Sequence, residues 1–243
     1  MRDFEEFRLC LRKKEKSKRF TKTPCVMRRL SMADKDEALA LHRAMAAGAR
    51  PEVFVPGSDE NFLRILDGDG AALGVLEGRK IVCMRTALFR PPNDGPLGLP
   101  QVERAAFIDY CIVHRDYQGN NLQFLTYYHL ENFLWEEFDH LYTTVSPRNV
   151  FSLRNVIGCG FYALQMQELY GGHMRYVLRK DLKHCPSIRM KRPSGAPIRD
   201  YPAQQRLMDA GKVGYRLVRH ISGLWMLFGR LAHRAGSRNH ARK

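Results

Sequence analysis

The sequence predicts an α/β domain, because two of its segments each combine a short apolar strand, a polar turn and an amphipathic helix. Residues 106–113 are apolar and rich in β-formers, and a polar turn at 114–117 separates them from a helical segment that opens at Gln118. In that segment the apolar side chains recur every three to five residues. Residues 141–145 begin a second such unit, whose helix ends before Gly160 as a helix stop should.

The elements before this pair are predicted by capping and turn signals. Residues 25–30 are predicted to form a first strand, and Ser31 is a good N-cap for the next helix because Asp34 completes a capping box. In chain order we then expect a linker at 50–56, a helix at 59–66, two strands at 71–76 and 81–89 around a tight polar turn, and a proline-rich loop at 90–101.

The elements after the pair are predicted less uniformly. Residues 161–182 have the pattern of two strands around a Tyr-Gly-Gly turn, residues 184–201 that of a connector, and residues 203–210 that of a short helix stopped at Gly211. From Tyr215 onward an apolar stripe flanked by arginines predicts a basic amphipathic helix. Such a helix would pack on the domain or on a partner protomer, and contact with a membrane surface is the alternative.

Length and composition indicate one sizeable domain with extensions. The chain has 243 residues, 44% of them hydrophobic, and lacks a run of about eighteen apolar residues that would span a membrane. No apolar segment of the kind found in secretory signals follows the N-terminus. Six scattered cysteines without metal-ligand spacing favour reduced thiols in a cytoplasmic protein, with no disulfides and no metal.

The formal net charge of +15 is concentrated at the two ends of the chain. Such a charge suits a polyanionic cofactor, nucleic acid or an acidic membrane surface, whereas basic ends are most often solvated tails. We therefore expect three regions: a short amphipathic or disordered basic extension at 1–23, the domain at 24–183, and a connector with the basic amphipathic helix at 184–243. The basic residues near the N-terminus are Arg8, Arg12, Lys13, Lys14, Lys16, Lys18, Arg19 and Lys22.

Two motifs within residues 26–182 resemble those of the GNAT N-acetyltransferase superfamily. The first is a strand ending at Val113 and followed by the residues Gln118, Gly119, Asn120, Asn121, Leu122 and Gln123, which is similar to the acyl-CoA motif of that family. The second is the strand–Asn–helix–Gly-Phe pattern formed by Asn149, Ser152, Gly160 and Phe161. This chain departs from the family pattern in having Gln118 for an arginine, and Asn121 and Gln123 where small residues are usual.

The resemblance implies a GNAT-like mixed, largely antiparallel sheet flanked by helices on both faces, with a V-shaped split between its fourth and fifth strands. It also implies acetyl-CoA as co-substrate, with its pyrophosphate held by the turn at 118–123, where a helix start offers backbone N–H groups. The backbone of Cys111, Ile112 and Val113 would then pair with the pantetheine amides. Asn149 and Ser152 are carried over as contacts to the pantetheine arm or to the helix start.

Asp109 is the candidate general base, because a carboxylate within an apolar strand should have a raised pKa. The alternative is a structural aspartate bonded to the backbone or to an arginine. The family's usual general acid, a tyrosine, is replaced by Val156, and Tyr110, Tyr162 and Tyr170 are the nearby substitutes. A cysteine in a buried strand, such as Cys111, is usually an inert packing residue. The acceptor wall would lie at the first two helices, with Glu52, Phe54, Asp59 and Glu60 as candidates.

The function that follows from the resemblance is acetyl-CoA-dependent N-acetylation of a primary amine on a small molecule or a protein. The alternative is a catalytically weak acyl-CoA-binding domain that acts through its basic ends on nucleic acid or an anionic surface. A homodimer is a further partner arrangement that we consider.

Overall fold

The chain folds around one continuous, mostly antiparallel sheet. The computed structural model describes residues 4–89, 104–183 and 186–232, without the side chains of 190–193. Within these residues the sheet has eleven strands in the order β1-β2-β3-β4-β5-β6-β8-β7-β10-β11-β9. The strands are β1 (Phe7–Lys14), β2 (Phe20–Arg29), β3 (Gly70–Glu77), β4 (Lys80–Leu88), β5 (Ala105–Val113), β6 (His140–Val145), β7 (Tyr162–Leu169), β8 (His173–Asp181), β9 (Ser187–Pro197), β10 (Val213–His220) and β11 (Gly223–Ala232).

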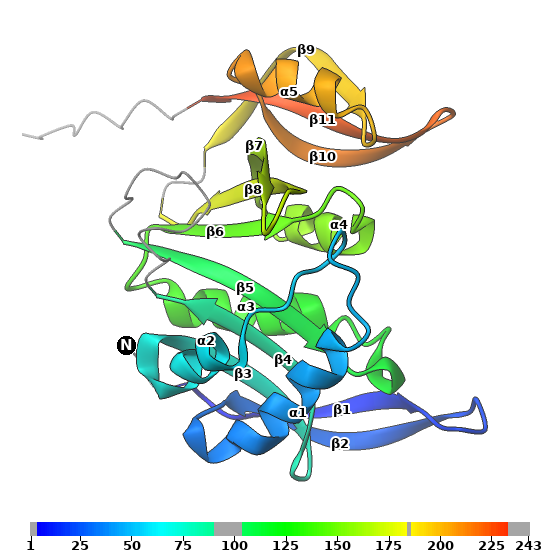
Figure 1. The fold of residues 1–243 in the computed structure, drawn as a ribbon, viewed down its shortest axis with the longest axis vertical. Coiled ribbons are helices and arrows are strands. Elements are labelled where there is room, and N and C mark those ends of the chain that lie inside the picture. The colour runs from blue at the N-terminus through cyan, green and yellow to red at the C-terminus, as the bar shows by residue number, and fades with distance from the viewer. Residues whose placement is uncertain (1–3, 90–103, 184–185, 233–243) are drawn as a thin grey trace, which may run out of the picture.

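Helices cover both faces of the first half of this sheet, as the family resemblance implies (Figure 1). Phe62 of α2 packs with Ala72 on one face, whereas Leu130 of α3 packs with Leu73 on the other. Neighbouring strand residues point to opposite faces, so Ala72 and Leu73 mark the two sides of β3. The helices are α1 (Lys35–Ala46), α2 (Asp59–Arg64), α3 (Leu122–Leu134), α4 (Val150–Gly158) and α5 (Tyr201–Asp209).

The sheet splits between β5 and β6, which form its parallel pair. Their ladder comprises Ala105 with His140, Ala106 with Leu141 and Phe107 with Tyr142, and no further pairing joins the two strands. Both strands continue past this point, to Val113 and Val145, and diverge (Figure 1). These are the fourth and fifth strands of the sequence prediction, so the V-shaped split is confirmed.

Local signals predicted most of the central elements correctly. Ser31 and Asp34 form the expected capping box, which here starts a short 3₁₀ turn that leads into α1. The helix predicted from Gln118 begins only at Leu122, because residues 118–121 form the turn itself. The predicted loop at 90–101 lies outside the described residues.

The basic N-terminal segment forms a hairpin with β2 and is not disordered; of the two expectations, the amphipathic one fits. β1 pairs antiparallel with β2, from Phe7 opposite Met27 to Lys14 opposite Phe20. Alternation explains the difference: Leu11 is 6% exposed on the inner face, whereas Arg12 and Lys14 point outward. A strand spaces its outward side chains two residues apart, so its lysines and arginines are compatible with burial of the opposite face.

The C-terminal segment also corrects the sequence prediction, because β10 and β11 replace the expected basic amphipathic helix and β9 replaces much of the connector. Gly223 follows the turn between β10 and β11 with φ at +118°, a conformation that favours glycine and does not occur within a helix. β10 joins the main sheet through Gly214 opposite Ala163 of β7. Among the described residues, no helix has the length and apolar character needed to cross a membrane.

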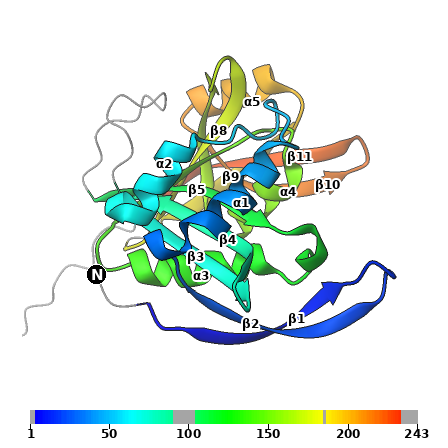
Figure 2. The same cartoon turned by 60° about the horizontal axis from the view of Figure 1, so that its bottom comes forward.

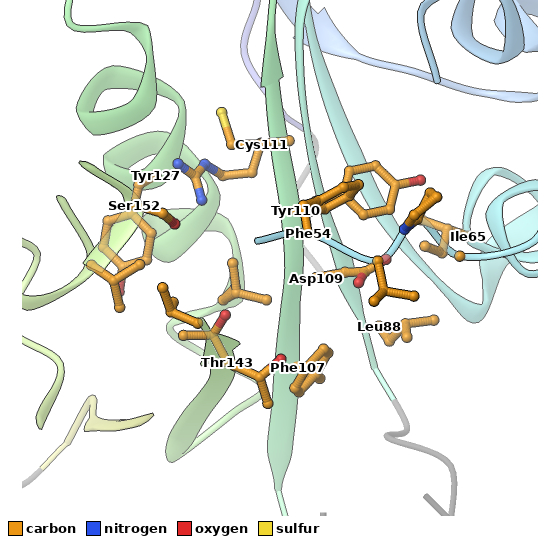
Figure 3. A pocket seen from close by; sticks show the side chains of 18 of the residues that line it. Phe54, Ile65, Leu88, Phe107, Asp109, Tyr110, Cys111, Tyr127, Thr143 and Ser152 are labelled. Carbon is orange, nitrogen blue, oxygen red and sulfur yellow. The ribbon is translucent and has the colours of Figure 1, made fainter. Parts of the chain in front are cut away.

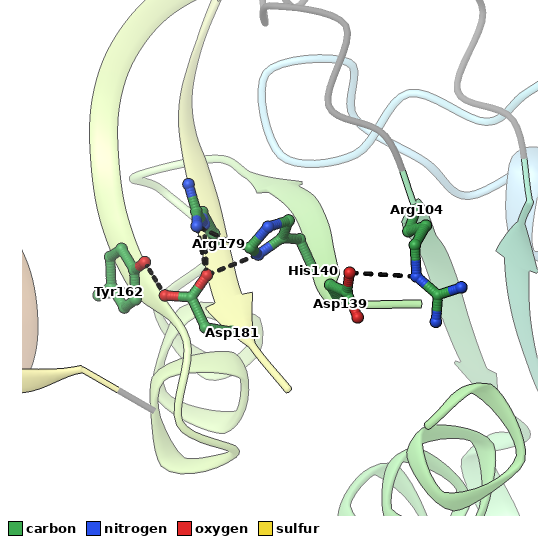
Figure 4. A network of polar contacts seen from close by, with 6 residues as sticks. All are labelled: Arg104, Asp139, His140, Tyr162, Arg179 and Asp181. Carbon is green, nitrogen blue, oxygen red and sulfur yellow. Dashed lines mark hydrogen bonds and ion pairs between the residues drawn. The ribbon is translucent and has the colours of Figure 1, made fainter. Parts of the chain in front are cut away.

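A buried carboxylate fastens the strands beside the closed end of the split (Figure 4). Asp181 of β8 is 7% exposed and lies opposite His140, the first residue of β6. One of its oxygens accepts from Tyr162 at 2.6 Å, and the other meets His140 at 2.7 Å and the Arg179 Nε at 2.7 Å. These partners supply the hydrogen bonds that a buried carboxylate requires.

Candidate active site

The split between β5 and β6 opens into a cavity of about 1000 Å³ (Figure 3). Its wall combines residues of β5, β6, α3 and α4 with the loop between α1 and α2. Figure 3 shows Asp109 and Tyr110 on the side of β5 where Phe54 and Ile65 lie. Tyr127 and Ser152 lie on the other side of the strand. The cavity thus has two halves, one formed by the first two helices and one between α3 and α4.

A bulge in β5 directs Asp109 and Tyr110 into the first half. The register of β5 with β4 shifts between Ala87 opposite Ile108 and Arg85 opposite Cys111, so two β5 residues face the single residue Thr86. The shift reverses the alternation of the strand. Ile108 and Cys111 therefore pack toward α3, whereas Tyr110 packs with the first two helices.

Asp109 is only partly accessible at the cavity wall. Burial raises the pKa of its carboxyl from 3.8 to about 7, because the charged form loses solvation there. A carboxyl with such a pKa exchanges a proton near neutral pH, as a general base must. Asp109 thus has the partly buried position and the raised pKa that the sequence analysis expected of it. Its role as general base stays a prediction.

The predicted cofactor residues separate into two groups. Cys111, Gln123, Asn149 and Ser152 line the cavity. The side chain of Asn149 is the N-cap of α4 and accepts from the Ser152 N–H at 3.1 Å. Gln123 bonds the side chain of Asn155, another lining residue.

The second group forms the turn before α3 and lies outside the cavity lining. Gly119 has φ at +87° and Asn121 has φ at +54°, so the turn needs residues that tolerate left-handed backbone. Asn121 is the N-cap of α3 but makes no side-chain capping bond. The N–H of Phe124 donates to the Asn121 carbonyl at 3.0 Å, so the N–H groups of Leu122 and Gln123 are the ones left for another acceptor. Leu122 and Ile112, by contrast, are buried packing residues on opposite faces of the sheet, and Val113 packs in the same cluster as Leu122.

Arg85 is a buried cation at the cavity wall that no local sequence signal indicated. Its Nη2 donates to the Gln123 carbonyl at 2.7 Å and its Nε to the Thr126 hydroxyl at 3.1 Å. A hydrogen bond from Cys83, together with the charge of Arg85, lowers the pKa of the Cys111 thiol. Cys111 is partly exposed and lines the cavity.

Of the three tyrosines that the sequence suggested, Tyr110 and Tyr170 line the cavity and Tyr162 does not. Tyr162 lies outside the cavity lining and donates to Asp181. Tyr170 lines the cavity and its hydroxyl is 3.0 Å from Thr144. Tyr110 and Tyr127 line the cavity as well, and their buried hydroxyls have no hydrogen-bond partner among the described residues. Tyr127, from α3, was not among the sequence candidates.

The loop between α1 and α2 forms part of the cavity wall. Arg175 of β8, which is 3% exposed, donates to the Pro51 carbonyl at 2.6 Å, and Ser146 donates to the Glu52 carbonyl at 2.6 Å. These bonds tie the loop to the far side of the split, so Phe54 is positioned in the cavity wall.

Of the other predicted acceptor-side residues, Glu52 thus contributes its backbone. Asp59 pairs with Arg43 at 2.7 Å. Glu60 lies outside the cavity lining. Within the part of the chain that the structure describes, no three His, Cys, Asp or Glu side chains cluster as a metal site would require.

Comparison with known proteins gives a clear result for the fold. Neither a protein-family model nor a curated protein sequence matches the chain. Among solved structures, a GNAT-family acetyltransferase from Streptococcus pneumoniae is similar, with 15% identity and a TM-score of 0.52 over 65% of this chain and 99% of the other. The ribosomal-protein-S18-alanine N-acetyltransferase of Escherichia coli is also similar, with 15% identity and a TM-score of 0.52. That match covers 65% of this chain and 94% of the other.

A chain of the NatC complex bound to Gag peptide and CoA gives 13% identity and a TM-score of 0.52, and the match covers 65% of this chain and 99% of that one. In all three matches, about two thirds of this chain superimposes on nearly the whole of the other chain. This chain therefore has the fold of the GNAT-family acetyltransferase from Streptococcus pneumoniae and of the other two structures.

Proposed function

We propose that the protein is an acetyl-CoA-dependent N-acetyltransferase that acts on a primary amine. The observation that carries this proposal is the position of Asp109, a carboxyl with a pKa of about 7, in the wall of the cavity at the sheet split. The fold neighbours include enzymes named as acetyltransferases, which supports the reaction class. Two of them are named with a protein or peptide, which favours a protein amine over a small molecule as acceptor.

The residues present fit acetyl-CoA. Beyond Phe107 the edge of β5 that faces the split has no strand partner within the described part of the chain, so its backbone groups can pair with an extended ligand that carries amides. The uncapped start of α3 and the Gly119 turn suit a diphosphate. The cavity is as large as a typical small-molecule site.

Each part of the site has a separate task in the transfer. Bound acetyl-CoA would supply the activated thioester carbonyl. Asp109 would accept a proton from the ammonium of the acceptor, directly or through water, so that the neutral amine can attack. The loop tied down by Arg175 and Ser146 would hold the acceptor in place and exclude water.

Calorimetric titration with acetyl-CoA tests this proposal. We expect saturable binding to the wild type and a loss of about ten- to a hundredfold in affinity for Gly119→Asp, because a carboxylate at the turn repels the phosphates. The matched control is Gly223→Asp, which also replaces a left-handed glycine with open space around it, in the β10–β11 turn. A folded wild type that does not bind acetyl-CoA, or equal losses in the two variants, would contradict the proposal.

A further inference from the structure

We propose that the basic β1–β2 hairpin is the binding site for the 3′-phosphate of the acyl-CoA nucleotide, with Arg12 and Lys14 as the recognising side chains. The inference rests on the proposed function, since it assigns a second part of the same ligand. It also gives a role to the basic side chains of residues 8–22, whose number the fold alone does not explain.

The hairpin is bonded directly to the turn that precedes α3. The side-chain Oδ1 of Asn120 accepts from the Arg12 N–H at 2.9 Å, and its side-chain Nδ2 donates to the Arg12 carbonyl at 2.7 Å. The same Nδ2 also donates to the Tyr117 carbonyl at 2.9 Å. Asn120 thus satisfies both backbone groups of Arg12 on the free edge of β1, as a neighbouring strand would.

Buried side chains shared by β1 and the turn before α3 hold the hairpin and the turn together. Leu11 of β1 packs in one buried cluster with Tyr117 and Leu122, the residues on either side of the turn. Tyr117 is 1% exposed and Leu122 is 2% exposed. The far end of the hairpin reaches beyond the body of the protein on the side where the β5–α3 turn lies (Figure 2). The hairpin therefore has a fixed position relative to the predicted diphosphate turn.

The basic side chains of β1 differ in whether an acidic residue of the protein pairs with them. Lys13 points inward and pairs with Glu77 at 2.8 Å. Arg12 and Lys14 alternate with it and are exposed. The Arg12 guanidinium lies over the Phe20 ring at 4.4 Å, which holds the side chain in place while its N–H groups stay at the surface. Lys14 has no ion-pair partner among the described residues.

The charge balance favours an anionic ligand at this surface. Residues 8–22 contain eight basic side chains and one acidic one, Glu15, which is bonded to Thr21. Coenzyme A carries a phosphate monoester on its ribose in addition to the diphosphate. When the diphosphate occupies the Gly119 turn, a second phosphate at the same end of the ligand would meet the cations next to Asn120.

The test compares coenzyme A with 3′-dephospho-coenzyme A, which differs only in this phosphate. Calorimetric titrations at low and at physiological ionic strength would use the wild type and the Arg12→Gln/Lys14→Gln double variant. The substitutions keep the backbone groups that bond Asn120. The Arg216→Gln/Arg219→Gln variant removes two exposed charges from β10 and is the matched control for net charge.

We expect the wild type and the control to bind coenzyme A at least tenfold more tightly than the dephospho form. In the double variant this ratio should fall to about one, with the affinity for the dephospho form unchanged. An unaltered ratio, or equal losses for both ligands, overturns the inference and leaves the proposed function standing. Salt-sensitive binding of an RNA oligonucleotide that the same variant abolishes, with an unaltered ratio, assigns the hairpin to nucleic acid instead. Absence of binding of either ligand to the wild type would reject the proposed function itself.

Discussion

Replacement of Asp109 by asparagine is expected to lower kcat/KM for amine acetylation by about 10²- to 10⁴-fold, the usual contribution of a general base. Asparagine keeps the shape of the side chain at the bulge and removes its capacity to accept a proton. Steady-state assays with acetyl-CoA and one acceptor amine provide the measurement. The matched control is Asp69→Asn, because Asp69 also lines the cavity but is exposed and paired with Arg64 at 2.5 Å.

The pH dependence makes this prediction specific. Because the pKa of Asp109 is raised to about 7, the carboxyl is protonated below that pH and cannot act as a base. The kcat/KM of the wild type should therefore increase about tenfold per pH unit up to pH 7 and then level off. Ionisation of the acceptor adds a slope of its own, which the variant shares. A wild type and an Asp109→Asn variant with the same profile and similar rates would show that Asp109 is not the base.

The same substitution should make the protein more stable at neutral and alkaline pH. Between the unfolded pKa of about 4 and the folded pKa of about 7, the folded state holds a proton that the unfolded chain releases. Stability of the wild type therefore falls as the pH rises through this range and stays lower above it. Asparagine does not carry this cost, so its gain in unfolding free energy above pH 7 should be at most about 4 kcal/mol. Urea unfolding at pH 4 and pH 8 would measure the difference.

The sequence predicted the part of the fold that short-range signals determine. The strand, turn and helix around Gly119 follow each other within thirty residues, and their apolar periodicity and turn residues agree. The capping box of Ser31 and Asp34 could be predicted because its two partners are three residues apart in the sequence. The split was implied by the family resemblance and not by the residues themselves.

The two ends of the chain were mispredicted because long-range pairing decides their structure. From Tyr215 to Leu231 the apolar side chains fit a helical stripe, yet Val218 and Trp225 are strand partners across the Gly223 turn. In β1, the charge density suggested a solvated tail, while the burial of Leu11 depends on residues more than a hundred positions away. Propensity is a weak guide when such contacts override it.

The residues of the site likewise fall into those that the sequence alone indicated and those that only the folded structure reveals. Asp109 could be selected from the sequence because a carboxylate in an apolar strand is unusual on its own. Arg85, Tyr127 and Arg175 carry no comparable signal, since each belongs to a different element and reaches the cavity only through the assembled sheet. The β5 bulge, which places Asp109 and Tyr110 together, is visible only in the register of two paired strands.

Replacement of Asp181 by alanine is expected to reduce the free energy of unfolding by about 3–5 kcal/mol, the usual cost of removing one partner from a buried ionic network. The substitution leaves the Tyr162 hydroxyl buried and the Arg179 guanidinium without its carboxylate. Because His140 pairs with both Asp181 and Ala105, the closed end of the split should also loosen. Urea unfolding at constant pH provides the measurement.

Asp139→Ala is the matched control for this effect (Figure 4). Asp139 lies next to His140 and also bonds an arginine, Arg104, at 3.1 Å, but its side chain is 37% exposed compared with 6% for Asp181. An exposed ion pair contributes about 0–1 kcal/mol, so this variant should unfold at nearly the wild-type urea concentration. If the two variants lost equal stability, burial would not be what makes Asp181 important. The larger loss at Asp181 would show that the carboxylate holds β6 and β8 together beside the split, and that the geometry of the cavity depends on it.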